Sequence, residues 1–96
     1  MTPTDLRASL AATSPPPDLT LPLQALWWDA RGDWNQAHTC AMRDNTQAGA
    51  AVHAYLHRKE GDQSNARYWY NRASRPPAET SLDDEWEALA RELLAT

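Results

Sequence analysis

The chain has 96 residues, a hydrophobic content of 42% and a net charge of −4. Its length suits one domain, because a shorter part would be too small to hold a core of its own. The mild negative charge disfavours general binding to nucleic acids or anionic membranes, since both attract a positive field. No apolar run approaches the length of a membrane span, so no membrane association is expected. The lone cysteine, Cys40, excludes an internal disulfide and indicates a reducing cytoplasm.

The first 20 residues are predicted to form an arm and a proline-rich linker, ahead of a helical domain over residues 21–96. In the arm, Thr4 is placed to cap a short helix that carries Leu6 and Leu10 at helical spacing. The three prolines at positions 15–17 exclude helix and favour a stiff linker.

Two helical pairs are expected next, each bent at a Gly-Asp corner. The first helix begins near Leu21 and ends at Gly32, and the second covers about residues 34–43. The third covers about residues 47–59 and ends at Gly61, and Asp62 or Ser64 caps the fourth. Each helix has an apolar stripe; the four stripes are Leu23, Leu26, Trp27 and Ala30; Trp34, Ala37 and Ala41; Ala48, Ala51, Val52, Tyr55 and Leu56; and Ala66, Trp69, Tyr70 and Ala73.

A fifth helix is predicted after the break at Pro76–Pro77, with Thr80 or Ser81 as its cap. It is expected to cover the open end of the stack with an apolar face made of Trp86, Leu89, Ala90, Leu93 and Leu94. No stretch shows the alternation of a strand. The predicted fold class is therefore all-α, with two antiparallel hairpins, a C-terminal capping helix and a short N-terminal helix or arm.

The two helical pairs are related by an internal repeat of 29 residues, which aligns Gly32 with Gly61. Small residues at Ala25, Ala37, Ala54 and Ala66 are expected to let the paired helices approach closely. The segment 50–77 resembles one tetratricopeptide repeat, whose pattern is matched by Ala54, Gly61, Ala66, Tyr70, Ala73 and Pro76 or Pro77.

The upstream copy of the repeat keeps Ala25, Trp28, Gly32, Trp34 and Ala37, but it has Ala41 where the family prefers an aromatic residue. The spacing is also shorter than the family's 34 residues. The resemblance implies a reduced pair of stacked hairpins, which would form a surface suited to extended partners. The block HAYLHRKEGD…YWY also resembles short bacterial proteins of unknown function, a likeness that implies no activity.

Charge is distributed unevenly along the chain. Residues 53–75 contain five Lys or Arg against two acids, whereas residues 76–96 contain six acids against one Arg. We expect the two segments to attract each other across the fold. The alternative is a basic face built for an acidic ligand.

His53 and His57 lie one helical turn apart, and Glu60 shares their face. These three residues form an alternative metal site, with His38 as an extra ligand that nothing in the sequence places nearby. The repeat register turns both histidines toward the interior. The apolar stripe of the same helix turns them to the far side, and the sequence leaves these two orientations open.

The preferred interpretation is a non-enzymatic helical binding module for a peptide, an acidic protein segment or a second copy of the chain in a homodimer. No cofactor and no catalytic residue are predicted. Tyr68 lies opposite its helix's apolar stripe and is expected to be exposed, as interface anchors often are. The candidate binding residues are Trp28, His53, His57, Tyr68 and Arg72.

Two other functions are kept as alternatives. The first is a metal- or small-ligand-binding protein or enzyme centred on His53, His57 and Glu60. The second is a weak binder of single-stranded nucleic acid, because basic residues interleave with Tyr55, Tyr68 and Trp69. The acidic overall balance disfavours the second.

Overall fold

A computed structural model describes all 96 residues, which form helices and connecting loops without any strand. This confirms the all-α prediction. None of the helices combines the length and the hydropathy needed to cross a membrane. The helices are α1 (Pro3–Ala8), a 3-10 turn η1 (Ser9–Ala11), α2 (Leu21–Ala30), α3 (Trp34–Met42), α4 (Gln47–Glu60), α5 (Gln63–Arg72) and α6 (Leu82–Leu94).

The two corner glycines end α2 and α4 in the same way. Gly32 and Gly61 have φ angles of +88° and +92°, a left-handed conformation that glycine adopts without steric cost. No atom lies within 4 Å of an added Cβ at either position, so backbone conformation rather than space selects glycine. The next residues, Asp33 and Asp62, cap α3 and α5 by accepting backbone N–H groups at 3.0 and 3.1 Å. The corners are therefore structural equivalents, as the 29-residue repeat predicts.

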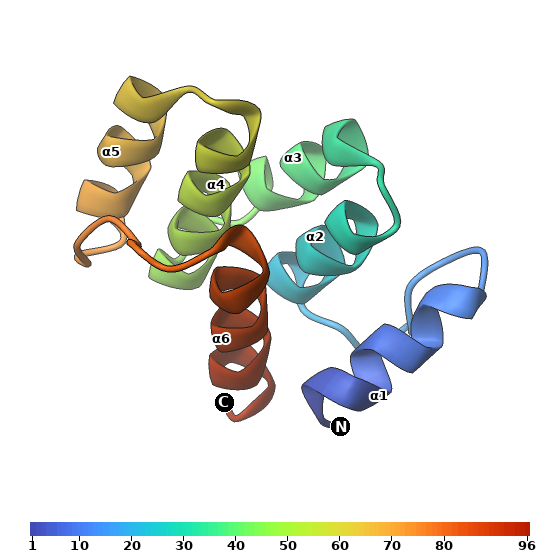
Figure 1. The fold of residues 1–96 in the computed structure, drawn as a ribbon. Helices are drawn as coiled ribbons and strands as arrows, with labels where there is room; N and C mark the ends of the chain where they lie inside the picture. Colours follow the sequence, from blue (N-terminus) through green and yellow to red (C-terminus); the bar gives the residue numbers. More distant parts are fainter.

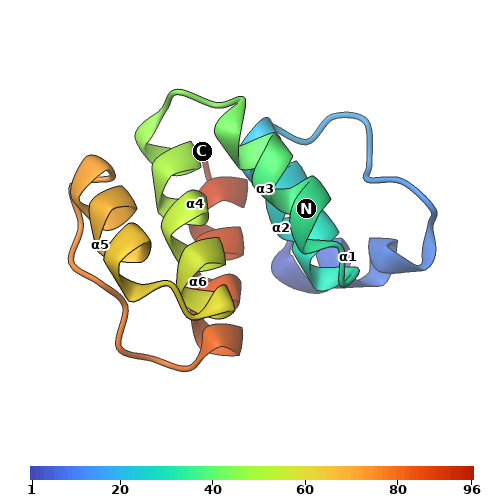
Figure 2. The ribbon, with the colours of Figure 1, turned by 90° about the horizontal axis from the view of Figure 1, so that it is seen from above.

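Helix α4 lies at the centre of the fold, with α2, α3, α5 and α6 packed around it (Figures 1 and 2). Every residue from Gly49 to His57 is buried. This resolves the two orientations that the sequence left open, because the apolar stripe and the histidines both face the interior. The four small residues of the repeat, Ala25, Ala37, Ala54 and Ala66, are at most 1% exposed, as expected for closely packed pairs.

Helix α6 packs across α2 and α4, which confirms the predicted capping helix. The indole Nε1 of Trp86 donates a hydrogen bond to the carbonyl of Leu26 at 2.9 Å, and Ser81 caps the helix. Helix α1 packs against α6 and α2, and its Leu6 is fully buried. The N-terminal arm therefore belongs to the same core as the helices that follow it.

Two local expectations were wrong. Thr2, not Thr4, caps α1, because its side chain and that of Asp5 bond to each other's backbone N–H groups at 3.1 and 3.0 Å. Ala30, the last residue assigned to the first apolar stripe, is exposed at the end of α2.

Two buried carboxylates tie the outer helices to the central pair. Asp29 of α2 accepts hydrogen bonds from the Tyr55 hydroxyl at 2.7 Å and from Lys59 Nζ at 2.9 Å. Glu85 of α6 accepts from the Tyr70 hydroxyl at 2.6 Å and from Arg58 at 2.8 Å. Burial, together with these carboxylates, raises the pKa of both tyrosines. The links from Arg58 to Glu85 and from Arg75 to Glu92 confirm that the basic segment and the acidic tail attract each other.

Replacing Glu85 by Ala is expected to lower the free energy of unfolding by about 3 kcal/mol, because it leaves a buried tyrosine hydroxyl and a largely buried arginine without their partner. Glu92→Ala is the matched control, since its ion pair with Arg75 is half-exposed, and it should cost less than about 1 kcal/mol. Urea denaturation followed by circular dichroism measures both values. Equal losses in the two variants would show that Glu85 has no special structural role.

Candidate functional site

The three histidines of the chain converge on one point between α3 and α4. His38 comes from α3, and His53 and His57 come from successive turns of α4. The ring centroids of His38 and His53 are 4.6 Å apart, and the His57 centroid lies 5.2 and 4.9 Å from them. One ring nitrogen of each lies within 4.8 Å of those of the other two. We call these three residues the histidine cluster.

Two tryptophans form the walls of the histidine cluster. The Trp69 ring of α5 stacks on His53 with centroids 3.8 Å apart, and the Trp34 ring of α3 stacks on His38 at 4.8 Å. Trp34 is fixed by a hydrogen bond from its Nε1 to the Leu56 carbonyl at 2.9 Å. His53 and His57 are 4% and 6% exposed, whereas His38 and both tryptophans are half-buried. The cluster is therefore covered, with His38 as its most accessible member.

Hydrogen bonds fix the orientation of the rings. His53 Nε2 and His38 Nε2 lie 2.9 Å apart and share one proton. His57 Nδ1 lies 2.6 Å from Glu60 Oε2, and because a carboxylate only accepts, the ring must donate. This places a proton of His57 on Nδ1, the ring nitrogen that faces Glu60.

The surroundings favour the uncharged forms of His38 and His53. Burial lowers the pKa of His53 to about 4, and the neighbouring His38 and His57 lower it further. Burial and His57 also lower the pKa of His38, while Glu60 opposes this shift. At neutral pH His38 and His53 therefore offer imidazole lone pairs rather than positive charges. Neutral imidazoles can accept protons or bind metal ions.

The five candidate binding residues lie in three different places. His53 and His57 are interior, where Trp34 of α3 and Trp69 of α5 cover them, so these two histidines cannot touch a partner directly. Trp28 of α2 is half-buried and lines a hollow around Gly32 and Asp33. Tyr68 and Arg72 lie together on α5, where the Arg72 guanidinium donates to the Tyr68 hydroxyl at 3.1 Å.

The sequence did not reveal that His38 belongs to the histidine cluster or that Trp34 and Trp69 form its walls. Trp34 and His38 are four residues apart on α3, a spacing that places both on one helix face. Nothing local shows that this face meets the histidines of α4, because that depends on how the two hairpins stack. Glu60, expected beside the histidines as a ligand, instead holds the ring of His57.

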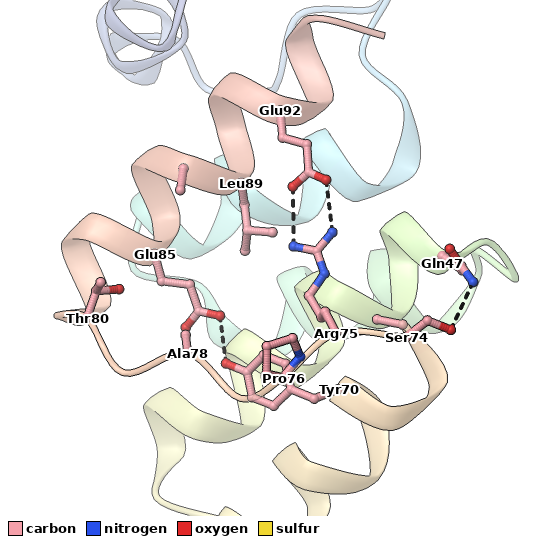
Figure 3. A pocket seen from close by; sticks show the side chains of 12 residues that line it. Gln47, Tyr70, Ser74, Arg75, Pro76, Ala78, Thr80, Glu85, Leu89 and Glu92 are labelled. Carbon is pink, nitrogen blue, oxygen red and sulfur yellow. Dashed lines mark hydrogen bonds and ion pairs between the residues drawn. The ribbon is translucent and has the colours of Figure 1, made fainter.

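A second hollow of about 480 Å³ lies between α5, α6 and the segment that joins them (Figure 3). Its polar side chains are already engaged with one another: Glu85 with Tyr70, Arg75 with Glu92, and Gln47 with Ser74. None of the three histidines lines it. This hollow therefore holds ties between helices and offers few free groups for a ligand.

No protein-family model matches this chain, and searches of curated proteins and of solved structures found no match either. The assignment of the candidate site therefore rests on its geometry alone. The likeness to a tetratricopeptide repeat rests only on the sequence residues that suggested it.

The stability of the metal-free protein is expected to fall as the pH drops from about 6.5 to 4. The unfolded His53 ring binds a proton near pH 6.5, whereas the folded ring does so only near pH 4. Between these values the unfolded state holds more protons, so stability is complete above pH 6.5 and decreases by about 2 kcal/mol on the way to pH 4.

Urea titrations at several pH values, with a chelator present, measure this loss. Carboxylates also titrate in this range, so His53→Gln serves as the reference because it removes only the ring. Between pH 6.5 and 4, the free energy of unfolding of that variant should fall by about 2 kcal/mol less than that of the wild type. Parallel profiles would contradict the assigned burial of a neutral His53.

Proposed function

We propose that this chain is a non-enzymatic helical module that binds a protein or peptide through a surface on α3 and α5. The observation that carries the proposal is Tyr68, which is 51% exposed and is covered on one side by Arg72. Exposed tyrosine next to arginine is the composition of an interface anchor. The stacked hairpins supply a rigid support for such a surface.

The anchor continues into neighbouring side chains. Tyr68 packs edge-on against Trp69, with ring centroids 5.2 Å apart. Trp69 and Arg72 also line a small hollow of about 110 Å³, together with Met42 at the end of α3. Met42 is 60% exposed. Tyr, Trp, Met and Arg are the residue types enriched in interfaces, so we define the recognition surface as Met42, Tyr68, Trp69 and Arg72.

The charges around the recognition surface favour an acidic partner. Arg58, Lys59 and Arg75 are each engaged with a carboxylate of this chain. Arg67 and Arg72 of α5 and Arg43 at the end of α3 form no such ion pair, so three of the four arginines without one belong to the helices of the recognition surface. The fourth, Arg31, donates to the backbone carbonyls of Leu10 and Ala12. A peptide with acidic residues around one apolar side chain matches this arrangement.

Other features also fit this function. Three of the five basic residues between positions 53 and 75 are engaged in ion pairs, which leaves no continuous cationic track for single-stranded nucleic acid. The Cys40 thiol is buried, and burial raises its pKa, so it is a poor nucleophile. A free thiol suits the reducing cytoplasm, where we place the interaction.

Selection from a displayed peptide library is expected to enrich acidic peptides with an aromatic or leucine anchor. The double variant Tyr68→Ala and Arg72→Ala should weaken the best peptide at least about 10-fold, because two adjacent anchors are lost. Fluorescence polarisation measures the affinities, and sedimentation of the free chain shows whether a second copy is the partner.

Arg91→Ala is the matched control, since it removes the same charge from an exposed position on α6. It should leave peptide binding unchanged. A library that yields no binder, or a selected peptide that binds the double variant as tightly as the wild type, would refute this surface.

A further inference from the structure

We propose that the histidine cluster is a binding site for a zinc-type divalent transition-metal ion, with His38, His53 and His57 as its three protein ligands. One nitrogen of each ring lies within 4.8 Å of the other two, although the rings come from two helices. This inference goes beyond the peptide-binding function and does not depend on it.

The spacing of the nitrogens suits a small ion. A tetrahedral zinc ion holds imidazole nitrogens at 2.0–2.1 Å, which places them about 3.3 Å from one another. The Nε2 atoms of His38 and His53 are 2.9 Å apart. For this pair, a few tenths of an ångström of further separation would reach the spacing in a zinc site, and the ion would replace the proton that the two rings share.

The third ligand is already held in the orientation that a metal site needs. His57 donates its Nδ1–H to Glu60 at 2.6 Å, so Nε2 is the ring nitrogen left to bind an ion. A carboxylate behind a ligating histidine fixes the tautomer and makes the ring a stronger ligand. A carboxylate oxygen of Asp62 lies within 4.8 Å of both a ring nitrogen of His57 and a carboxylate oxygen of Glu60. Its negative charge would help to balance the charge of the ion.

The donor set selects among metals. Three imidazoles suit zinc, copper, nickel or cobalt, whereas magnesium and calcium prefer oxygen ligands. Three protein ligands leave a fourth tetrahedral position for water or for a group supplied by another molecule. The half-buried His38 provides access, and Trp34 and Trp69 limit the entry of bulk water. A bound ion would also fasten α3 to α4.

The test uses the full chain without an affinity tag, freed of metal by a chelator that is then removed. Calorimetric titration with Zn²⁺ should show one ion per chain with a Kd below about 1 µM. Co²⁺ should give the visible absorption of a tetrahedral complex. His38→Ala should weaken Zn²⁺ binding at least about 100-fold, because it removes one of three ligands. Gln36→Ala, on the exposed side of α3, is the control and should bind normally.

Glu60→Gln gives an independent readout if His38→Ala fails to fold. It keeps all three ligands, and it should weaken Zn²⁺ binding about 10- to 100-fold through the ring of His57. The exposed Glu79→Gln is its control. The proposal is overturned if the wild type shows no Zn²⁺ binding at 100 µM, a concentration about 100 times the expected Kd, since the histidines are then only hydrogen-bonded to one another. It is also overturned if the ion binds a folded His38→Ala or Glu60→Gln variant as tightly as the wild type.

Discussion

The complete burial of α4 is the constraint on which the rest of this structure depends. A helix with no exposed face over residues 49–57 must hide its polar side chains as well as its apolar ones. Each buried polar group then needs a partner from a neighbouring helix or turn. Tyr55 finds Asp29 of α2, His53 finds His38 of α3, and His57 finds Glu60 at the end of its own helix. The contacts of Tyr55 and His53 help to set where α2 and α3 lie against α4.

The internal repeat explains the scaffold, and the differences between its copies explain the site. Both copies keep the small residues and the Gly-Asp corner, so both fold into the same kind of hairpin. At the position equivalent to His57 the first copy has Trp28, which is only half-buried because α2 is not surrounded on every side. The second copy supplies the central helix, and its histidines occur where that helix meets α3 and α5. The recognition surface lies on α3 and α5, whereas the capping helix α6 packs on α1, α2 and α4.

Local features of the sequence predicted most of the fold. Apolar spacing, the Gly-Asp corners and the double proline gave the helices from Leu21 to Leu94 to within a few residues, because these signals act through neighbouring residues. Packing between distant segments was harder to predict. Whether His53 faced inward depended on how many helices surround α4, and the position of His38 depended on how α3 lies against it. The placement of α6 over α2 and α4 depends on contacts such as the one between Trp86 and Leu26, 60 residues apart.

Trp69 connects the recognition surface to the histidine cluster, because its ring stacks on His53 and also contacts Tyr68 edge-on. Both proposals require that His53 and His57 of α4 are buried against α3 and α5. Long-range ¹H–¹⁵N spectra of the imidazole rings in the metal-free protein test this claim most directly. The account predicts a His57 ring protonated on Nδ1 and a His53 ring that stays neutral at pH 5.5, because its pKa is about 4. A His53 ring that takes up its proton at the ordinary pH of about 6.5, with a His57 ring averaging between tautomers, would contradict it.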